Sequence, residues 1–69
     1  MKFNQHGVAW IDADDRYKLT QGIRGWDVWW RSNALGPHNR VARELLTFAA
    51  ACGAAREHQA EAAKLAYLV

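Results

Sequence analysis

The sequence predicts an α+β protein in which a three-stranded antiparallel β-meander, residues 1–35, is followed by one long C-terminal helix, residues 37–68. Before about residue 36, short runs of aromatic and β-branched residues alternate with turn-forming residues, as in successive short strands. After that point Ala, Leu, Glu, Arg and Lys dominate, and these are strong helix formers. Because the chain has only 69 residues, we expect residues 1–69 to form a single small domain.

The three expected strands lie in the runs VAWI, RYKL and WDVWWR, which are separated by DADD and TQGIRG. Side chains alternate between the two faces of a strand, so Trp26, Val28 and Trp30 share one face and Trp29 lies on the other. The inner face of the sheet is therefore expected to consist of Trp26, Val28 and Trp30, together with Tyr17 and Leu19 or their neighbours in the preceding strand. Trp29 is expected on the outer face, with Asp27 and Arg31.

The helix is expected to begin near Gly36 and Pro37, because proline is tolerated in the first helical turn and Asn39 can cap. One apolar stripe then recurs at spacings of three and four residues, and we expect it to pack on the sheet. Its members are Val41, Leu45, Phe48, Cys52 and Ala55. Gly53 costs about 1 kcal/mol relative to alanine inside a helix, and one long helix with a bend there is expected.

The C-terminal half of this helix leaves alternatives open. A helix of about 30 residues is about 45 Å long, which exceeds the length of a small sheet. Leu65, Tyr67 and Leu68 are expected either to form an exposed interaction patch or to fold back on aromatic residues of the N-terminal half. A third alternative is a structural homodimer through the C-terminal helix.

Charge is concentrated in the middle of the chain. Residues 16–43 hold six of the nine basic residues but only one of the seven acidic ones. This concentration is typical of a surface that meets an anionic partner. Cys52 is the only cysteine, and no run has the length of a signal peptide or a membrane span. We therefore expect a cytoplasmic protein with no membrane partner.

Catalytic and metal-binding patterns are not evident. DADD begins like a calcium loop, but Tyr17 and Ile23 occupy the positions that need Gly and Glu. The three histidines and Cys52 fit no zinc spacing. Cys52 belongs to the apolar stripe, where a thiol behaves as a small buried hydrophobe. We expect no enzymatic activity, no cofactor and no metal.

Binding to nucleic acid is one functional hypothesis. Arg16 and Lys18 alternate with Tyr17 on one strand, and Trp29 shares a face with Arg31 on another, which suits phosphate contacts and base stacking. The strand GWDVWW and the helix TFAAACGAAREH resemble the arm-type DNA-binding domains of phage integrases. The resemblance implies that the sheet enters the major groove of DNA. In that family a third strand directly precedes the helix, whereas residues 37–46 are expected to be helical here.

Binding to a protein is the second hypothesis, and the sequence favours it because a net charge of +2 is low for a dedicated DNA binder. The small, tryptophan-rich chain is similar to phage-encoded inhibitors of the anti-CRISPR type, which implies an inhibitor or regulator of a host nucleic-acid-processing complex. Tryptophan and arginine dominate binding hot spots. The candidate partner-binding residues are Arg16, Lys18, Arg24, Trp29, Arg31, Leu65, Tyr67 and Leu68. Two alternatives are open for such an inhibitor: the acidic loop of Asp12, Asp14 and Asp15 imitates phosphates, or the basic face binds an acidic protein.

Overall fold

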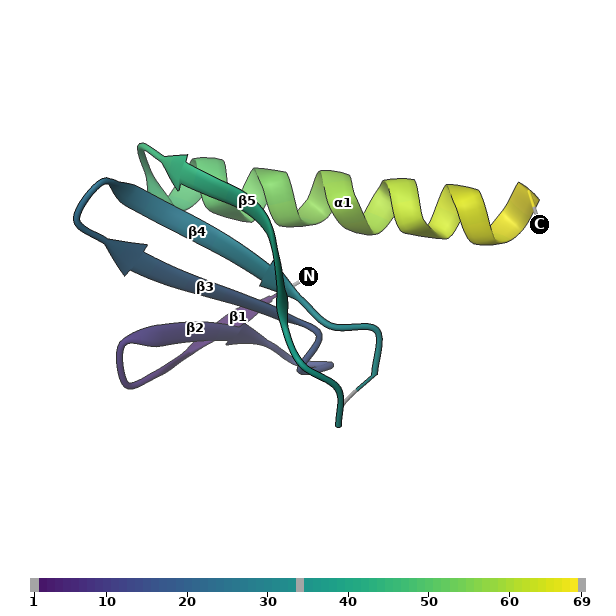
Figure 1. Cartoon of the computed structure of the whole chain (residues 1–69), viewed down its shortest axis with the longest axis horizontal. Coiled ribbons are helices and arrows are strands. Elements are labelled where there is room, and N and C mark those ends of the chain that lie inside the picture. The colour runs from purple at the N-terminus through teal and green to yellow at the C-terminus, as the bar shows by residue number, and fades with distance from the viewer. Residues whose placement is uncertain (1, 34, 69) are drawn as a thin grey trace.

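The computed structural model describes residues 2–33 and 35–68, with side chains up to Leu65. Within these residues a five-stranded antiparallel sheet is covered on one face by a C-terminal helix (Figure 1). The elements are β1 (Phe3–His6), β2 (Ala9–Asp12), β3 (Tyr17–Gly22), β4 (Gly25–Trp30), β5 (Asn39–Leu45) and α1 (Phe48–Leu68). The strands follow one another in the order β1-β2-β3-β4-β5. The α+β class is confirmed, and the expected number of three strands is wrong.

The three expected strands are present as β2, β3 and β4; the predicted faces of β4 are correct, and of the two alternatives for β3 it is Tyr17 and Leu19 that face the core. Leu19 lies opposite Val28 in the β3–β4 register, and both are fully buried. Trp29 lies opposite Lys18, on the face away from the helix. Trp26 and Trp30 are partly buried and pack against the core. The alternation of side chains along WDVWW was therefore sufficient to predict which side chains enter the core.

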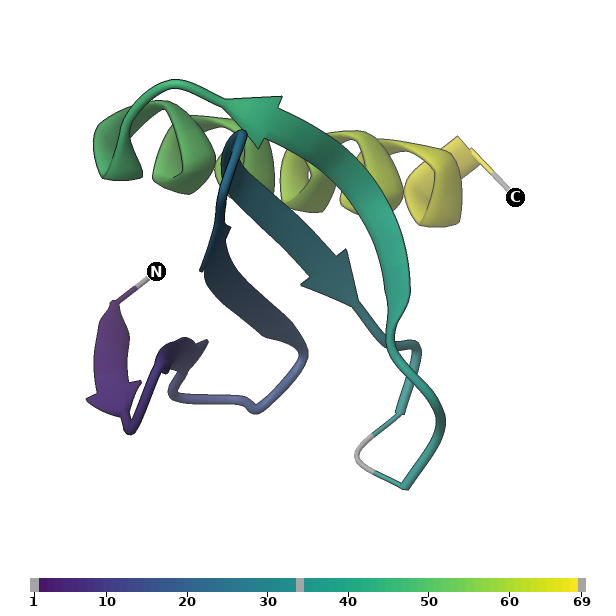
Figure 2. The same ribbon diagram turned by 60° about the vertical axis from the view of Figure 1, so that its left-hand side comes forward.

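The expected helix over residues 37–46 is wrong, because residues 39–45 form β5 at the edge of the sheet beside β4. Two β-bulges interrupt the β4–β5 pairing: Trp26 lies opposite Leu45, Val28 opposite Ala42 and Trp29 opposite Arg40. A bulge adds one unpaired residue and bends the strand, and β5 curves accordingly over the helix (Figure 2).

The bulges also explain why this strand resembles a helix in sequence. Without them, the pairing of Trp26 with Leu45 would place Arg43 opposite the buried Val28. With them, Ala42 faces the core instead, three residues from Leu45 and six from Phe48. Core-facing residues three positions apart, such as Ala42 and Leu45, are typical of a helix. The alternation of side chains every two residues, which would indicate a strand, is therefore not visible in this part of the sequence. Val41, expected on the apolar stripe, is 36% exposed on β5 and does not belong to the core.

The helix begins at Phe48 because Thr47 caps it. The Thr47 hydroxyl accepts a hydrogen bond from the Ala50 backbone N–H at 3.0 Å, which satisfies one of the free donors of the first turn. The helix continues through Gly53 without interruption (Figure 1). A β-carbon at Gly53 would meet no atom within 4 Å, so this glycine makes no close approach to another backbone.

The core lies between α1 and strands β3 to β5. Its buried residues are Tyr17, Leu19, Val28, Ala51, Cys52 and Ala55. Phe48 closes the core at the start of the helix, with its ring 4.9 Å from that of Trp10 and 5.2 Å from that of Trp26. Tryptophan therefore contributes much of the packing that a domain of this size needs.

The C-terminal part of α1 extends past the sheet (Figure 1). His58 is in contact with Tyr17 and Trp30, whereas Leu65, two turns further on, is 63% exposed. Leu65 therefore does not fold back on the N-terminal half. The side chains of Tyr67 and Leu68 lie outside the described residues. No helix among the described residues is long and apolar enough to cross a membrane.

Candidate functional site

The outer face of the sheet, which α1 does not cover, carries a row of side chains that crosses all five strands. The register places Asn4 opposite Ile11, Ile11 opposite Lys18, Lys18 opposite Trp29 and Trp29 opposite Arg40. The last three members, Lys18, Trp29 and Arg40, are called the cationic row below. These residues come from β3, β4 and β5. The helix α1 packs against the opposite face of the same three strands.

Trp29 is held in place from three directions. The Lys18 ammonium lies 5.5 Å and the Arg40 guanidinium 5.6 Å from the centroid of the indole ring, within the range of cation–π attraction. The indole N–H donates a hydrogen bond to the Thr20 hydroxyl at 2.9 Å. The ring therefore supports two cations on the surface, and its only polar group already has a partner.

Arg16 and Arg31, both candidate partner-binding residues, serve the fold. The Arg31 side chain is only 15% exposed and forms an ion pair with Asp15. Its Nε also donates to the Asp15 carbonyl at 2.8 Å. The Arg16 guanidinium donates to the Ser32 carbonyl. These contacts join the β2–β3 turn to the segment that follows β4. The charge of Arg31 is therefore neutralised by Asp15, and the guanidinium of Arg16 is already hydrogen-bonded within the protein.

His38 lies near the same end of the outer face. Its Nε2 is buried and has no hydrogen-bond partner among the described residues. Burial, and then the positive charges of Lys18 and Arg31, lower the pKa of the His38 imidazole, while Asp15 opposes this effect. At neutral pH the imidazole is therefore uncharged and adds nothing to the positive charge of the face.

The three aspartates of the acidic loop do not share one role. Asp12 is buried, and one of its carboxylate oxygens accepts the backbone N–H groups of Arg16 at 2.9 Å and Tyr17 at 2.8 Å. It closes the turn between β2 and β3. Asp15 is paired with Arg31, and Asp14 is exposed. Of the expected phosphate mimic, only Asp14 is left without such a structural contact among the described residues.

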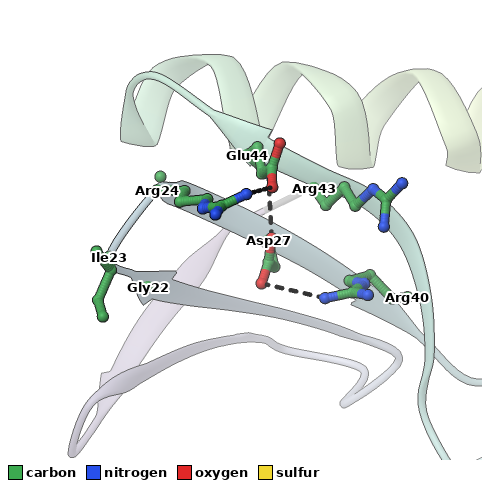
Figure 3. A pocket seen from close by; sticks show the side chains of 8 residues that line it. Gly22, Ile23, Arg24, Asp27, Arg40, Arg43 and Glu44 are labelled. Carbon is green, nitrogen blue, oxygen red and sulfur yellow. Dashed lines mark hydrogen bonds and ion pairs between the residues drawn. The ribbon is translucent and has the colours of Figure 1, made fainter.

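A second group of charges lies beside the cationic row, in a pocket of about 340 Å³ between the β3–β4 hairpin and β5 (Figure 3). Its lining residues are Gly22, Ile23, Arg24, Gly25, Asp27, Arg40, Arg43 and Glu44. Arg24 was a candidate from the sequence. Arg40 and Arg43 were noticed only as part of the basic segment, because the expected helix gave no reason to place them on the sheet.

Exposed aliphatic residues gather at the end of the sheet where this pocket lies. Val8, Ile23 and Leu46 are 90%, 105% and 89% exposed. They occupy the β1–β2, β3–β4 and β5–α1 connections, all at the same end of the strands; the β1–β2 turn lies apart from the other two connections (Figure 2). We call these three residues the aliphatic tips. Single apolar residues in loops carry no periodic signal, so these three residues could not be predicted from the sequence.

Cys52 is buried against the sheet, as expected from its position on the apolar stripe. Burial raises the pKa of its thiol, and the nearby Arg56 opposes this only in part. A protonated, buried thiol is a poor nucleophile. Within the described ranges, no group of three or more His, Cys, Asp or Glu side chains is arranged to hold a metal ion.

Comparison of the chain with protein-family models, with curated proteins and with solved structures finds no match in any of the three.

Proposed function

We propose that this protein binds nucleic acid through the outer face of its sheet. The observation that carries the proposal is the cationic row, in which Lys18 and Arg40 flank Trp29 on a surface that the helix leaves open. Long basic side chains that rest on an aromatic ring lose less conformational freedom when they meet a phosphate. The exposed Arg24 and Arg43 continue the positive charge along the same face.

The geometry favours nucleic acid over the protein partner that the sequence favoured. A tryptophan that anchors a protein interface inserts an available apolar surface into a pocket. Here two cations cover the Trp29 ring and Thr20 takes its N–H. What the face offers a ligand is therefore positive charge. Few aromatic rings are left for base stacking, because Tyr17 is buried and Trp30 packs against the core.

The resemblance to the phage-integrase arm domains is consistent with the proposal in one respect, because β5 directly precedes α1 although β1 and β2 extend the sheet beyond three strands. The chain from β3 to α1 has the order of three antiparallel strands and a helix that the resemblance requires. This agreement supports the proposal without identifying the ligand as duplex or single strand.

Fluorescence anisotropy with labelled duplex and single-stranded oligonucleotides over a series of salt concentrations tests the proposal. Binding should weaken steeply with salt, with each phosphate contact adding about 0.9 to the logarithmic slope for B-DNA and about 0.7 for a single strand. Lys18→Gln and Arg40→Gln should each lower the affinity. Each should also reduce the logarithmic salt slope by the contribution of about one phosphate contact.

Arg56→Gln is the matched control, because it removes the same charge from an exposed position on α1. It should leave the affinity nearly unchanged. The proposal is overturned if no oligonucleotide binds at low salt, or if Arg56→Gln weakens binding as much as Arg40→Gln does.

A protein-binding inhibitor or regulator is the second candidate, and the aliphatic tips favour it. Three fully exposed aliphatic side chains at one end of a small domain are a typical feature of an interface. The test is capture from a nuclease-treated bacterial lysate at about 0.5 M salt, where charge interactions are strongly screened. A partner held by the tips should be lost with Ile23→Ser and kept with Lys18→Gln; the reverse result would contradict this candidate.

A further inference from the structure

The pocket beside the cationic row is lined by three guanidinium groups and two carboxylates, and none of the three guanidinium groups donates a hydrogen bond to another of the described residues. Arg24 lies 3.8 Å from Glu44, and Arg40 lies 3.8 Å from Asp27. Both distances join guanidinium nitrogen to carboxylate oxygen and are too long for a hydrogen bond. Arg43 has no carboxylate partner among the described residues. Arg24 and Arg40 reach toward Glu44 and Asp27 from opposite sides of the pocket (Figure 3).

The floor of the pocket is built by the backbone and does not depend on these arginines. Asp27 accepts a hydrogen bond from the Glu44 backbone N–H at 3.1 Å. Glu44 has a φ of 58°, which non-glycine residues seldom adopt, at the second bulge of β5. Gly25 lies directly against this bulge, where a β-carbon would be 2.5 Å from the Leu45 carbonyl oxygen. The bulge and the hairpin therefore fix the shape of the pocket together.

The pocket also marks one end of the cationic row. Arg40 belongs to both, since it lies beside Trp29 and also lines the pocket. From Arg40 the pocket extends along β4 and β5 toward the β3–β4 hairpin, where Ile23 is fully exposed at the rim. A strand whose phosphates follow the row reaches Arg40 on the edge strand β5, where the pocket begins.

We propose that this pocket binds the terminal phosphate of a nucleic-acid strand. A terminal phosphate monoester carries about −1.5 to −2 charge at pH 7 and three unesterified oxygens, whereas an internal phosphate carries one charge and two such oxygens. The three guanidinium groups of the lining outnumber its two carboxylates, so the pocket has a net positive charge. Arg24 and Arg40 would exchange their long carboxylate contacts for charge-assisted bonds to the phosphate, which are the strongest bonds that arginine makes. The inference rests on the proposed function, because it specifies how the outer face engages the end of its ligand.

The test compares three oligonucleotides of identical sequence with a 5′-phosphate, a 3′-phosphate or hydroxyl groups at both ends. The probe form is the one, duplex or single strand, that binds the outer face. A phosphate at one of the two ends should tighten binding about tenfold, as expected for one or two additional charge-assisted hydrogen bonds. Arg43→Gln should abolish this gain, so that the variant binds all three probes with the same affinity. Arg56→Gln should retain the gain.

Equal affinities for all three probes, or a gain that persists in Arg43→Gln, would overturn the inference while leaving the proposed function intact. Absence of binding to every probe would overturn both. In the last experiment the protein is titrated with inorganic phosphate, and binding is measured from the NMR amide signals of Gly22 and Gly25, which line the pocket. If phosphate alone binds as tightly as the phosphorylated strand end, the pocket is a site for the free ion and the inference fails.

Discussion

The Tyr17 hydroxyl and Nδ1 of His58 share a hydrogen bond of 2.7 Å that joins β3 to α1. The two residues are 41 positions apart in the chain. The imidazole of His58 also packs against Tyr17 and Trp30. Burial, and then the Asp12 carboxylate, raise the pKa of the Tyr17 phenol, so the hydroxyl stays protonated at neutral pH. The hydrogen bond thus fixes the middle of the helix on the sheet.

Removing this hydrogen bond should destabilise the protein without altering the fold. Tyr17→Phe keeps the buried ring and should lower the free energy of unfolding by about 1 kcal/mol. Urea denaturation of Tyr17→Phe, His58→Gln and the double variant measures the coupling between the two side chains. Strictly additive effects would show that the hydrogen bond contributes nothing to stability.

The two faces of the sheet should respond differently to the loss of an aromatic ring. Phe48→Ala removes the ring that packs on Trp10 and Trp26 and should cost about 3 kcal/mol or more, enough to unfold much of so small a domain. Trp29→Ala should cost distinctly less, because Trp29 lies outside the core, yet it should weaken oligonucleotide binding. Thermal melting of both variants is the check, and equal losses would contradict the assignment of Trp29 to the outer face.

Two glycines should give opposite results when replaced by alanine. Gly53→Ala should stabilise the protein by about 1 kcal/mol, because the position is helical and a β-carbon meets no atom within 4 Å. Gly25→Ala should be strongly destabilising, because its φ of 141° and the Leu45 carbonyl at 2.5 Å leave no room for a β-carbon. The measurement is the melting temperature of each variant compared with that of the parent protein. A Gly53→Ala variant that melts at a lower temperature would indicate a bend or break in the helix.

The stability of the protein should fall as the pH drops below about 6.5, the ordinary pKa of histidine, in part because of His38. The pKa of His38 is lowered in the folded state, mainly by burial. The unfolded chain therefore binds the proton first as the pH falls, and protonation favours unfolding. His38→Gln should flatten the decline of the urea midpoint between pH 7 and pH 5. His6→Gln, at an exposed position, is the control and should not flatten it.

The Cys52 thiol should be unreactive in the folded protein. It is buried, and burial raises its pKa, so little thiolate is present or accessible. A chromogenic disulfide reagent should react far more slowly in native buffer than in denaturant. Fast reaction of the native protein would mean that the start of α1 opens readily from the sheet.

The fold class, the outward position of Trp29 and the burial of Phe48 and Cys52 could all be predicted from the sequence. These features follow from local periodicity, because alternation along a strand and spacing along a helix are properties of neighbouring residues. Thr47 also carried a usable local signal, since threonine is a good N-cap and precedes the true start of the helix. The weaker signal at Pro37 placed the start too early.

The candidate site could be predicted only in part. Lys18 and Trp29 were identified because both lie on regular strands. Arg31 was expected on the surface, but its ion pair with Asp15 depends on the β2–β3 turn and the end of β4 meeting in space. Arg40 was not placed on the sheet, because its strand was expected to be helical.

What the sequence determined by itself is therefore an α+β chain with an inner apolar face and a basic, aromatic outer face. Only the tertiary structure decided that residues 39–45 pair with β4. Their residues favour a helix, but two bulges allow both Ala42 and Leu45 to face the core while Arg43 stays outside it. Burial against β4 and α1 outweighs the small differences in helix propensity, since tertiary packing contributes more free energy than propensity does. The same pairing brings Arg40 to Trp29 and so completes the cationic row.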